Sequence, residues 1–160
     1  MKKILIVIGL LLIFVPSSLF IYMYKATMNS KNDGMQEAKS RIGEYLEGFE
    51  LQNSEVYFGD KKYFIFEGLN VNKEGTIIFV PESKDDEIIT EKVTNALTKQ
   101  DVQKYLEEKY NPSEIISIKL GMRDKVPLWE ATYVVETGNY VYEFLDFHTG
   151  DLLKKYTLKK

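Results

Sequence analysis

Cysteine is absent from the 160 residues, and histidine and tryptophan occur once each. Without cysteine, the chain has no disulfides, no thiolate metal site and no cysteine to carry a lipid. A zinc site needs two or more His or Cys ligands in almost every common arrangement, so the single His148 does not suffice. We therefore predict no metal and no cofactor, and a stability that comes from packing.

The usual signatures of catalysis are missing as well. No serine beyond the first 24 residues lies in a Gly-x-Ser-x-Gly elbow, and no glycine-rich loop is arranged to hold a phosphate. His148 falls in a predicted hairpin turn, where a relay with a carboxylate would have to form around an exposed loop. The 24 acidic residues leave a glycosidase-like pair open, although none stands out. The sequence predicts no catalytic residue and a protein that is not an enzyme.

What the chain does have is an uncharged apolar run over residues 4–24, preceded by Lys2 and Lys3. At about 1.5 Å of rise per residue, a helix of that length crosses a hydrocarbon core roughly 30 Å thick. A cleaved signal peptide is the alternative, but its apolar stretch spans only about 7–15 residues and ends in small residues. Here bulky residues follow the two serines of the run. We therefore predict a retained single-pass anchor, with residues 1–3 in the cytoplasm.

Residues 25–160 are then expected on the outer side of the cell membrane. Setting Lys2 and Lys3 aside reduces the 21 basic residues to 19, which against 24 acidic residues gives a net charge of −5. A negative domain lacks the electrostatic attraction that dominates binding to phosphate-rich partners. We therefore predict no nucleic-acid partner.

After a polar stalk over residues 25–34, helix-favouring residues at helical spacing occupy residues 35–46. Three segments rich in aromatic and β-branched residues then predict strands, at residues 55–58, 62–69 and 76–80. The run from Tyr63 to Phe66 is typical of a buried central strand. Pro81 ends this group because it cannot donate to a sheet ladder.

A charged connection over residues 83–97 includes residues 88–94, whose composition fits one more edge strand. Thr98 and Asp101 form a capping-box pattern that opens a second helix, which an Asn-Pro pair ends. Further strands joined by hairpin turns are expected at residues 114–122, 128–136, 139–147 and 151–158.

The order helix, strand, strand, strand thus occurs twice, at a spacing of about 60–65 residues. A domain near that size buries only about 60% of its unfolded surface, so we expect the two copies to pack together or to share a sheet. The predicted fold class is α+β, with a transmembrane helix followed by two tandem small units at residues 35–82 and 98–160. Each unit lays one helix on an antiparallel sheet.

Trp129 begins a strand in which it alternates with Ala131 and Tyr133 on one face. One interpretation is an exposed aromatic anchor for a partner or a sugar ring. The alternation favours the other, a core side chain beneath the helix over residues 101–109. We also expect some aromatic rings of the first unit to contact the second unit. The candidates are Tyr57, Phe64, Phe66 and Phe79.

Three stretches carry a family resemblance: the anchor with Tyr24 and Lys25, residues 56–63 leading to 78–81, and residues 128–133 leading to 146–150. The last is the most specific, because a Trp-Glu-x-x-Tyr strand, a second strand and Asp-x-x-Thr-Gly run in order. Together they resemble the TseB-like (YpmB-type) membrane-anchored proteins of Bacillus and related bacteria. The resemblance covers nearly the whole chain and implies paired PepSY-like or cystatin-like units.

This resemblance implies a regulator of cell-wall elongation that contacts a penicillin-binding transpeptidase at the outer membrane face, without catalysis. It supplies no signature of contacting residues, so the partner-binding positions stay unassigned. An alternative is an inhibitor or folding aid that acts in trans on an exported peptidase, because PepSY-like units resemble segments of peptidase propeptides.

Overall fold

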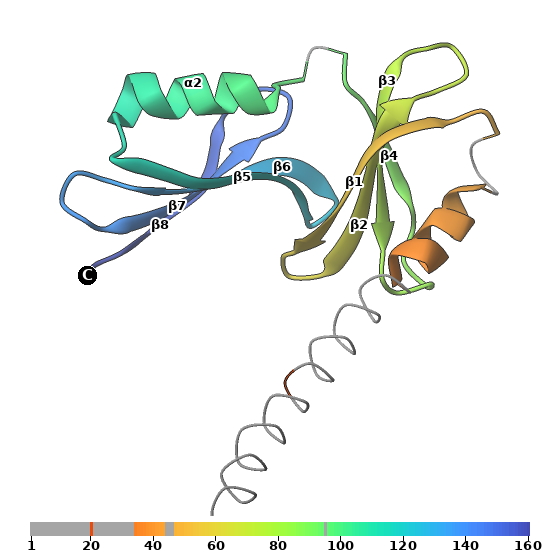
Figure 1. The fold of residues 1–160 in the computed structure, drawn as a ribbon, viewed down its shortest axis with the longest axis horizontal. Coiled ribbons are helices and arrows are strands. Elements are labelled where there is room, and N and C mark those ends of the chain that lie inside the picture. The colour runs from red at the N-terminus through yellow and green to blue at the C-terminus, as the bar shows by residue number, and fades with distance from the viewer. Residues whose placement is uncertain (1–19, 21–33, 44–46, 95) are drawn as a thin grey trace, which may run out of the picture. The chain divides into compact units, whose positions relative to one another are not determined.

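The computed structural model in Figure 1 describes four stretches of the chain, namely residue 20 and residues 34–43, 47–94 and 96–160. The chain divides into two compact units, residues 1–40 and residues 41–160. All the strands and the helix between the two groups of strands belong to the second unit.

The predicted anchor lies almost entirely outside the described residues. Of residues 4–24, only Phe20 is described, and its side chain is exposed. Among the described residues, no helix combines the length and apolar content that crossing a membrane requires. The stalk over residues 25–34 is described only at Gly34, so anchor and stalk both stay predictions.

Residues 34–43 form a helix with one apolar stripe. Ala38 and Ile42, spaced by one helical turn, are buried, as the spacing of an amphipathic helix requires. Arg41 opens the second unit and donates a hydrogen bond from Nη1 to the carbonyl oxygen of Pro81, 2.6 Å away. The first predicted helix is thus confirmed for its described residues.

The first sheet has four antiparallel strands in sequence order, β1 (Glu50–Phe58), β2 (Lys62–Leu69), β3 (Gly75–Pro81) and β4 (Ile89–Lys92). The central strands β2 and β3 are buried on both faces, and Phe64, Ile65 and Phe79 are at most 2% exposed. The central strand predicted at Tyr63 to Phe66 is therefore confirmed. β4 supplies the further edge strand that the composition indicated.

β1 begins earlier than its composition predicts. Residues 50–54 are exposed and mostly polar, so no alternation of apolar side chains marks them as a strand. Their pairing with β2 nevertheless continues to Glu50, opposite Leu69, past a bulge between Leu51 and Asn53. The strand extends because β2 offers backbone partners there, and a single segment's periodicity does not reveal such a tertiary pairing.

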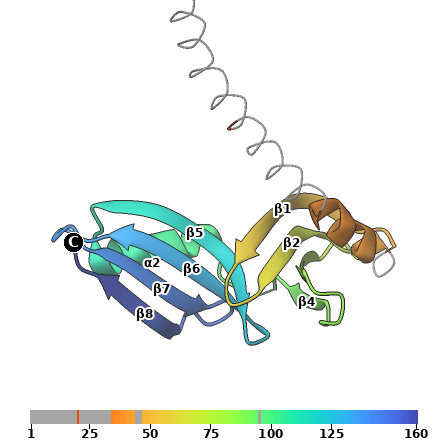
Figure 2. The same cartoon turned by 90° about the horizontal axis from the view of Figure 1, so that it is seen from below.

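The second sheet repeats the arrangement. α2 (Lys99–Tyr110) precedes four antiparallel strands in sequence order, β5 (Glu114–Arg123), β6 (Val126–Val134), β7 (Tyr140–Asp146) and β8 (Leu152–Leu158). α2 lies across one face of this sheet, and β8 runs along its outer edge (Figure 2). Tyr110 of α2 stacks on Tyr133 of β6 with 5.5 Å between ring centroids.

The ends of α2 are those that the sequence predicts. The Thr98 hydroxyl accepts a hydrogen bond from the Asp101 amide, and the Asp101 carboxylate accepts one from the Thr98 amide. Aspartate therefore completes the capping box that glutamate or glutamine more often closes. Asn111 ends the helix in the left-handed region with φ 42°.

Over the described residues the structure is α+β, with two antiparallel four-stranded sheets and helices at residues 34–43 and 99–110. Each copy therefore has four strands, because β4 adds to the three expected in the first copy and the second has all four strands expected after its helix. One apolar cluster contains Tyr57 and Phe79 of the first sheet together with Leu120 and Trp129 of the second. The expectation that the two copies pack together is confirmed for the described residues.

Candidate functional site

The two sheets join where Tyr57 of β1 packs on Gly121 of β5. A Cβ atom at position 121 would lie 2.5 Å from the Tyr57 ring, closer than real Cβ contacts come, so glycine makes room for the ring. The Tyr57 hydroxyl donates a hydrogen bond to Oε2 of Glu130 on β6 at 2.9 Å. Burial, helped by the charge of Glu130, raises the pKa of Tyr57 and keeps its hydroxyl a donor.

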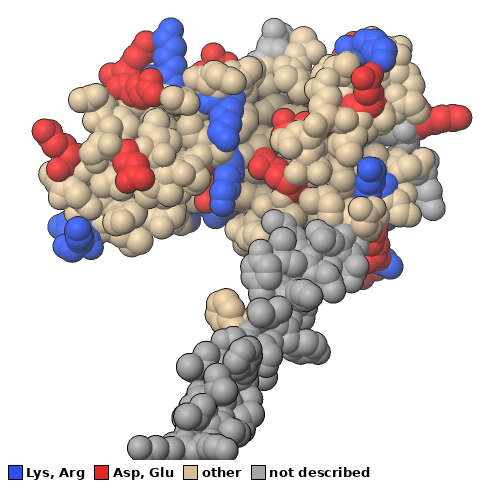
Figure 3. Space-filling model, viewed as in Figure 1, with Lys and Arg blue, Asp and Glu red and all other residues tan. Residues whose placement is uncertain are grey.

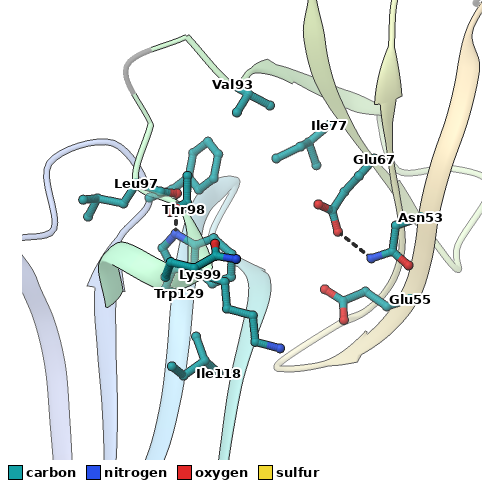
Figure 4. A pocket seen from close by; sticks show the side chains of 12 residues that line it. Asn53, Glu55, Glu67, Ile77, Val93, Leu97, Thr98, Lys99, Ile118 and Trp129 are labelled. Carbon is teal, nitrogen blue, oxygen red and sulfur yellow. Dashed lines mark hydrogen bonds between the residues drawn. The ribbon is translucent and has the colours of Figure 1, made fainter. Parts of the chain in front are cut away.

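Beside this joint lies a cleft of about 260 Å³, shown in Figure 4. Its polar wall comes from the first sheet, where β1 contributes Asn53 and Glu55 and β2 contributes Glu67. The facing wall combines Ile118 of β5 and Trp129 of β6 with polar residues at the start of α2, among them Lys99. The cleft therefore sets two carboxylates against a lysine and a tryptophan ring that is only 7% exposed.

The two carboxylates of the cleft differ in environment. Glu67 accepts a hydrogen bond at Oε1 from Nδ2 of Asn53, 3.0 Å away. Burial raises the pKa of Glu55 and the charge of Glu67 adds to this, against a smaller opposing effect of Lys99. A carboxyl group with a raised pKa in a cleft is typical of a functional site, although burial at a structural joint has the same effect.

Trp129 occupies the core rather than an exposed surface. Its side chain is 7% exposed, and the indole Nε1 donates to the carbonyl oxygen of Leu97 at 3.1 Å. The ring also packs near Phe147, with 6.2 Å between centroids. The preferred interpretation is thus confirmed in its burial, but the groups that hold the indole are Leu97, just before α2, and Phe147. Tyr133 is the residue of this strand that stacks on a ring of the helix.

His148 lies in the turn between β7 and β8, as predicted, with its side chain 42% exposed. Its Nε2 is 3.4 Å from Oε2 of Glu91 on β4. The imidazole therefore bridges a turn of the second sheet and an edge strand of the first. This position suits a polar contact between two partly exposed side chains better than proton transfer inside a closed site.

A polar cluster beneath α2 was missed by sequence reasoning. Its centre is Glu143 of β7, which is fully buried. The Glu143 carboxylate accepts hydrogen bonds from the hydroxyls of Tyr105, Tyr110 and Tyr133 at 3.1, 3.3 and 2.7 Å. The ammonium group of Lys155 on β8 is 3.0 Å from the same carboxylate. The available signal was the position of Glu143, whose neighbours two residues away, at 141 and 145, are apolar and buried.

The two charged side chains of the cluster, Glu143 and Lys155, pair with each other. Burial, aided by Glu143, raises the pKa of Tyr133, so this tyrosine stays protonated. Burial alone would lower the pKa of Lys155, but hydrogen bonds with Tyr133 and Glu143 raise it, so the lysine stays charged. Among the described residues, no buried side-chain nitrogen or oxygen lacks a hydrogen-bond partner. Because a fully satisfied network rigidifies a core, we assign the cluster a structural role.

Neither feature resembles a metal centre. In the part of the chain that the structure describes, no group of three or more His, Cys, Asp or Glu side chains is arranged to hold a metal ion. Glu55 and Glu67 come with an amide and a lysine rather than with further ligands.

No family model matches the chain. It is similar to a curated protein of Bacillus subtilis (strain 168), "Probable cell wall elongation regulator TseB", with 24% identity over 135 residues that cover 84% of each chain. It is also similar to the solved structure of the YpmB protein from Bacillus subtilis, with a TM-score of 0.70 and 23% identity over 77% of this chain and 96% of that one. The chain is TseB/YpmB-like.

In this TseB/YpmB-like chain, the most specific stretch of the resemblance has a structural explanation. Trp129 of the Trp-Glu-x-x-Tyr strand binds the Leu97 carbonyl, and Tyr133 binds Glu143. Asp146 of Asp-x-x-Thr-Gly accepts hydrogen bonds from the backbone amides of His148 and Thr149 at 2.9 and 2.8 Å. These hydrogen bonds give the stretch a structural role in the second sheet.

Proposed function

We propose that the chain is a membrane-anchored extracytoplasmic interaction protein that regulates cell-wall elongation through contact with a penicillin-binding transpeptidase. The observation that carries this proposal is the likeness to TseB over 84% of both chains, because the printed name of that protein is that of a cell wall elongation regulator. The likeness to YpmB supports a common α+β fold for the exported part. The contact with a transpeptidase comes from the family resemblance.

In this proposal residues 4–24 anchor the protein in the membrane and residues 25–160 lie outside the cell. A stalk over residues 25–34 carries two PepSY-like units at 35–82 and 98–160, joined by the connection at 83–97. The uncharged run behind two lysines supports the anchor. Membrane fractionation and N-terminal sequencing test it, since a mature N-terminus between residues 17 and 30 would contradict retention.

The proposed action is non-catalytic. The buried polar cluster of Glu143 is satisfied internally, and the cleft at Glu55 offers carboxylates without a serine, cysteine or histidine among its lining residues. The full-length chain should therefore leave purified peptidoglycan fragments unchanged. Release of muropeptides that depends on Glu55 or Glu67 would instead show an enzyme.

Crosslinking in cells tests the partner directly. A photo-reactive amino acid is placed, one position at a time, at exposed residues of the full-length chain, with Phe58 and Val71 for the first sheet and Ile116 and Leu158 for the second. Mass spectrometry of the crosslinked products should identify a wall-synthesising transpeptidase from at least one position. Failure at every position, with the chain present in the membrane at normal levels, would contradict the proposal.

A further inference from the structure

β8 stands apart from every other strand because all seven of its residues are exposed. It is the last strand of the second sheet and pairs only with β7 among the described residues. In an antiparallel pair, alternate residues direct their N–H and C=O groups away from the neighbouring strand. The outer side of β8 therefore presents a row of backbone donors and acceptors to solvent, which is the template that strand addition uses.

The β4 edge of the first sheet differs. β4 has only four residues, and two of them, Ile89 and Glu91, are partly buried. Glu91 is also 3.4 Å from His148 of the β7–β8 turn. A short strand covered in this way is a common protection against pairing with other chains. β8 has the length that β4 lacks.

The exposed side chains of β8 are unusually apolar for an unprotected edge. Leu152, Leu153, Tyr156 and Leu158 are between 42% and 56% exposed. A bulge in the pairing opposite Phe144 and Leu145 bends the first part of the strand, so the regular ladder runs from Lys154 to Leu158. A partner strand would find continuous backbone groups along this part.

The charge along β8 has one sign. Residues 152–160 contain four lysines, at 154, 155, 159 and 160, and no acidic residue. Lys155 is held by Glu143, whereas the other three form no ion pair with any described residue. Two copies of β8 paired with each other would bring these lysines together, so the charge disfavours self-association and favours an acidic segment.

We propose that the outer edge of β8 binds an extended acidic segment of a partner protein, which adds to the second sheet as a fifth strand. This inference rests on the proposed function and names the surface and the partner chemistry for it. Backbone hydrogen bonds supply the pairing, Tyr156 and Leu158 supply apolar contact, and Lys154 selects carboxylates. A membrane surface fits less well, because the exported part is negative overall.

A defined peptide tests the pairing. The probe is a fluorescent nine-residue peptide that alternates valine and glutamate, added to the full-length chain and followed by anisotropy. Two control peptides keep the length: one replaces each glutamate by lysine, and the other replaces alternate valines by proline, which cannot complete a ladder. Binding of the acidic peptide alone is expected. Equal binding of the proline peptide would overturn strand pairing, and equal binding of the lysine peptide would overturn the charge selection.

Charge reversal locates the surface. The triple variant Lys154→Glu, Lys159→Glu, Lys160→Glu should bind the acidic peptide on the order of tenfold or more weakly, because each close like-charge pair opposes docking. A matched variant reverses the same number of exposed lysines elsewhere, Lys61→Glu, Lys73→Glu, Lys104→Glu, and should bind like the parent. Equal weakening in both variants would mean that only net charge acts, which contradicts the proposal.

Hydrogen exchange separates this surface from other outcomes. Amides of β8 should gain protection when the acidic peptide binds, whereas amides of β4 should not. Protection at β4 or at neither edge would overturn the proposal, as would binding to vesicles containing phosphatidylglycerol without binding to the peptide. In cells, a transpeptidase captured from Phe58 or Val71 but never from Leu158 would leave the proposed function standing and remove β8 as its surface.

Discussion

The two sheets have the same order of elements but differ in their last strands, since β4 is partly buried and β8 is exposed throughout. In the first sheet, six consecutive residues of β3, from Thr76 to Pro81, are buried. In the second, β8 has no buried residue, and a glutamate lies in the core under the helix. Figure 3 shows acidic and basic side chains interspersed among the described residues on one face of the molecule. The repeat in the sequence therefore predicts the same topology twice, but not the same role.

This difference shows that the position of a strand within its sheet decides the burial of its side chains more than its composition does. β3 is central and has neighbours on both sides, so its apolar side chains are covered whichever face they take. β8 is an edge, and its leucines stay exposed although leucine is usually buried in cores. For this reason we propose β8, and not the first sheet, as the surface that contacts a partner.

The largest effect should come from the core that the sheets share. Trp129→Ala is expected to lower the free energy of unfolding by about 3–5 kcal/mol, as truncation of a large core side chain does. Urea denaturation of the full-length chain measures it. Trp129→Phe keeps much of the volume but leaves the Leu97 carbonyl without its donor, so it should cost less, about 1–3 kcal/mol. A Trp129→Ala variant that unfolds like the parent would show that this ring is not part of the common core.

The next largest loss of unfolding free energy is expected at the buried Glu143 of the second sheet. Glu67, which lines the cleft in the first sheet, should matter much less. Glu143→Gln removes the negative charge of a carboxylate that accepts hydrogen bonds from three tyrosines and pairs with Lys155. The free energy of unfolding should fall by about 1.5–3 kcal/mol, the range for hydrogen bonds to charged groups. Glu67→Gln alters a single exposed hydrogen bond with Asn53 and should cost under about 0.5 kcal/mol. Similar losses in both variants, by urea denaturation, would remove the contrast.

A single methyl group added where the two sheets meet should destabilise the protein. Gly121→Ala places a Cβ atom against the Tyr57 ring, which is itself buried, and should cost about 1–3 kcal/mol by overpacking. Gly43→Ala is the matched control, because its Cβ would meet nothing within 4 Å, and in a helix alanine should stabilise by about 0.5–1 kcal/mol. In a Tyr57→Ala background the cost of Gly121→Ala should largely vanish. If it persists, the ring is not its cause.

The smallest effect is a pH dependence carried by Glu55. Burial holds the pKa of Glu55 in the folded chain above its ordinary value of 4.5. The folded chain therefore binds the carboxyl proton more tightly than the unfolded chain does. The resulting stability is present below pH 4.5 and is lost as the pH rises through the folded pKa. Relative to Glu55→Gln, the parent should therefore become less stable between acid and neutral pH. A difference that stays flat, in melting temperatures measured across this range, would place Glu55 in open solvent.

Much of the fold follows from the sequence because its signals are local. The capping box of α2 spans Thr98 to Asp101, and the hairpin turn at residues 148–151 is made by hydrogen bonds between near neighbours. The apolar run from Tyr63 to Phe66 is long enough to mark a central strand without any knowledge of its partners. Such interactions act within a few residues, so a single segment contains all the information they need.

The site was decided by tertiary structure alone. The hydrogen bond between Tyr57 and Glu130 joins residues 73 positions apart, and the cleft beside it exists only because two sheet edges meet. Glu143 looks like any acidic residue of a strand until three tyrosines and Lys155 surround it. The sequence by itself determined the helices, most of the strands and the α+β class. Which edges meet and which strand stays open depend on how the two sheets pack, because those contacts join segments that no local pattern connects.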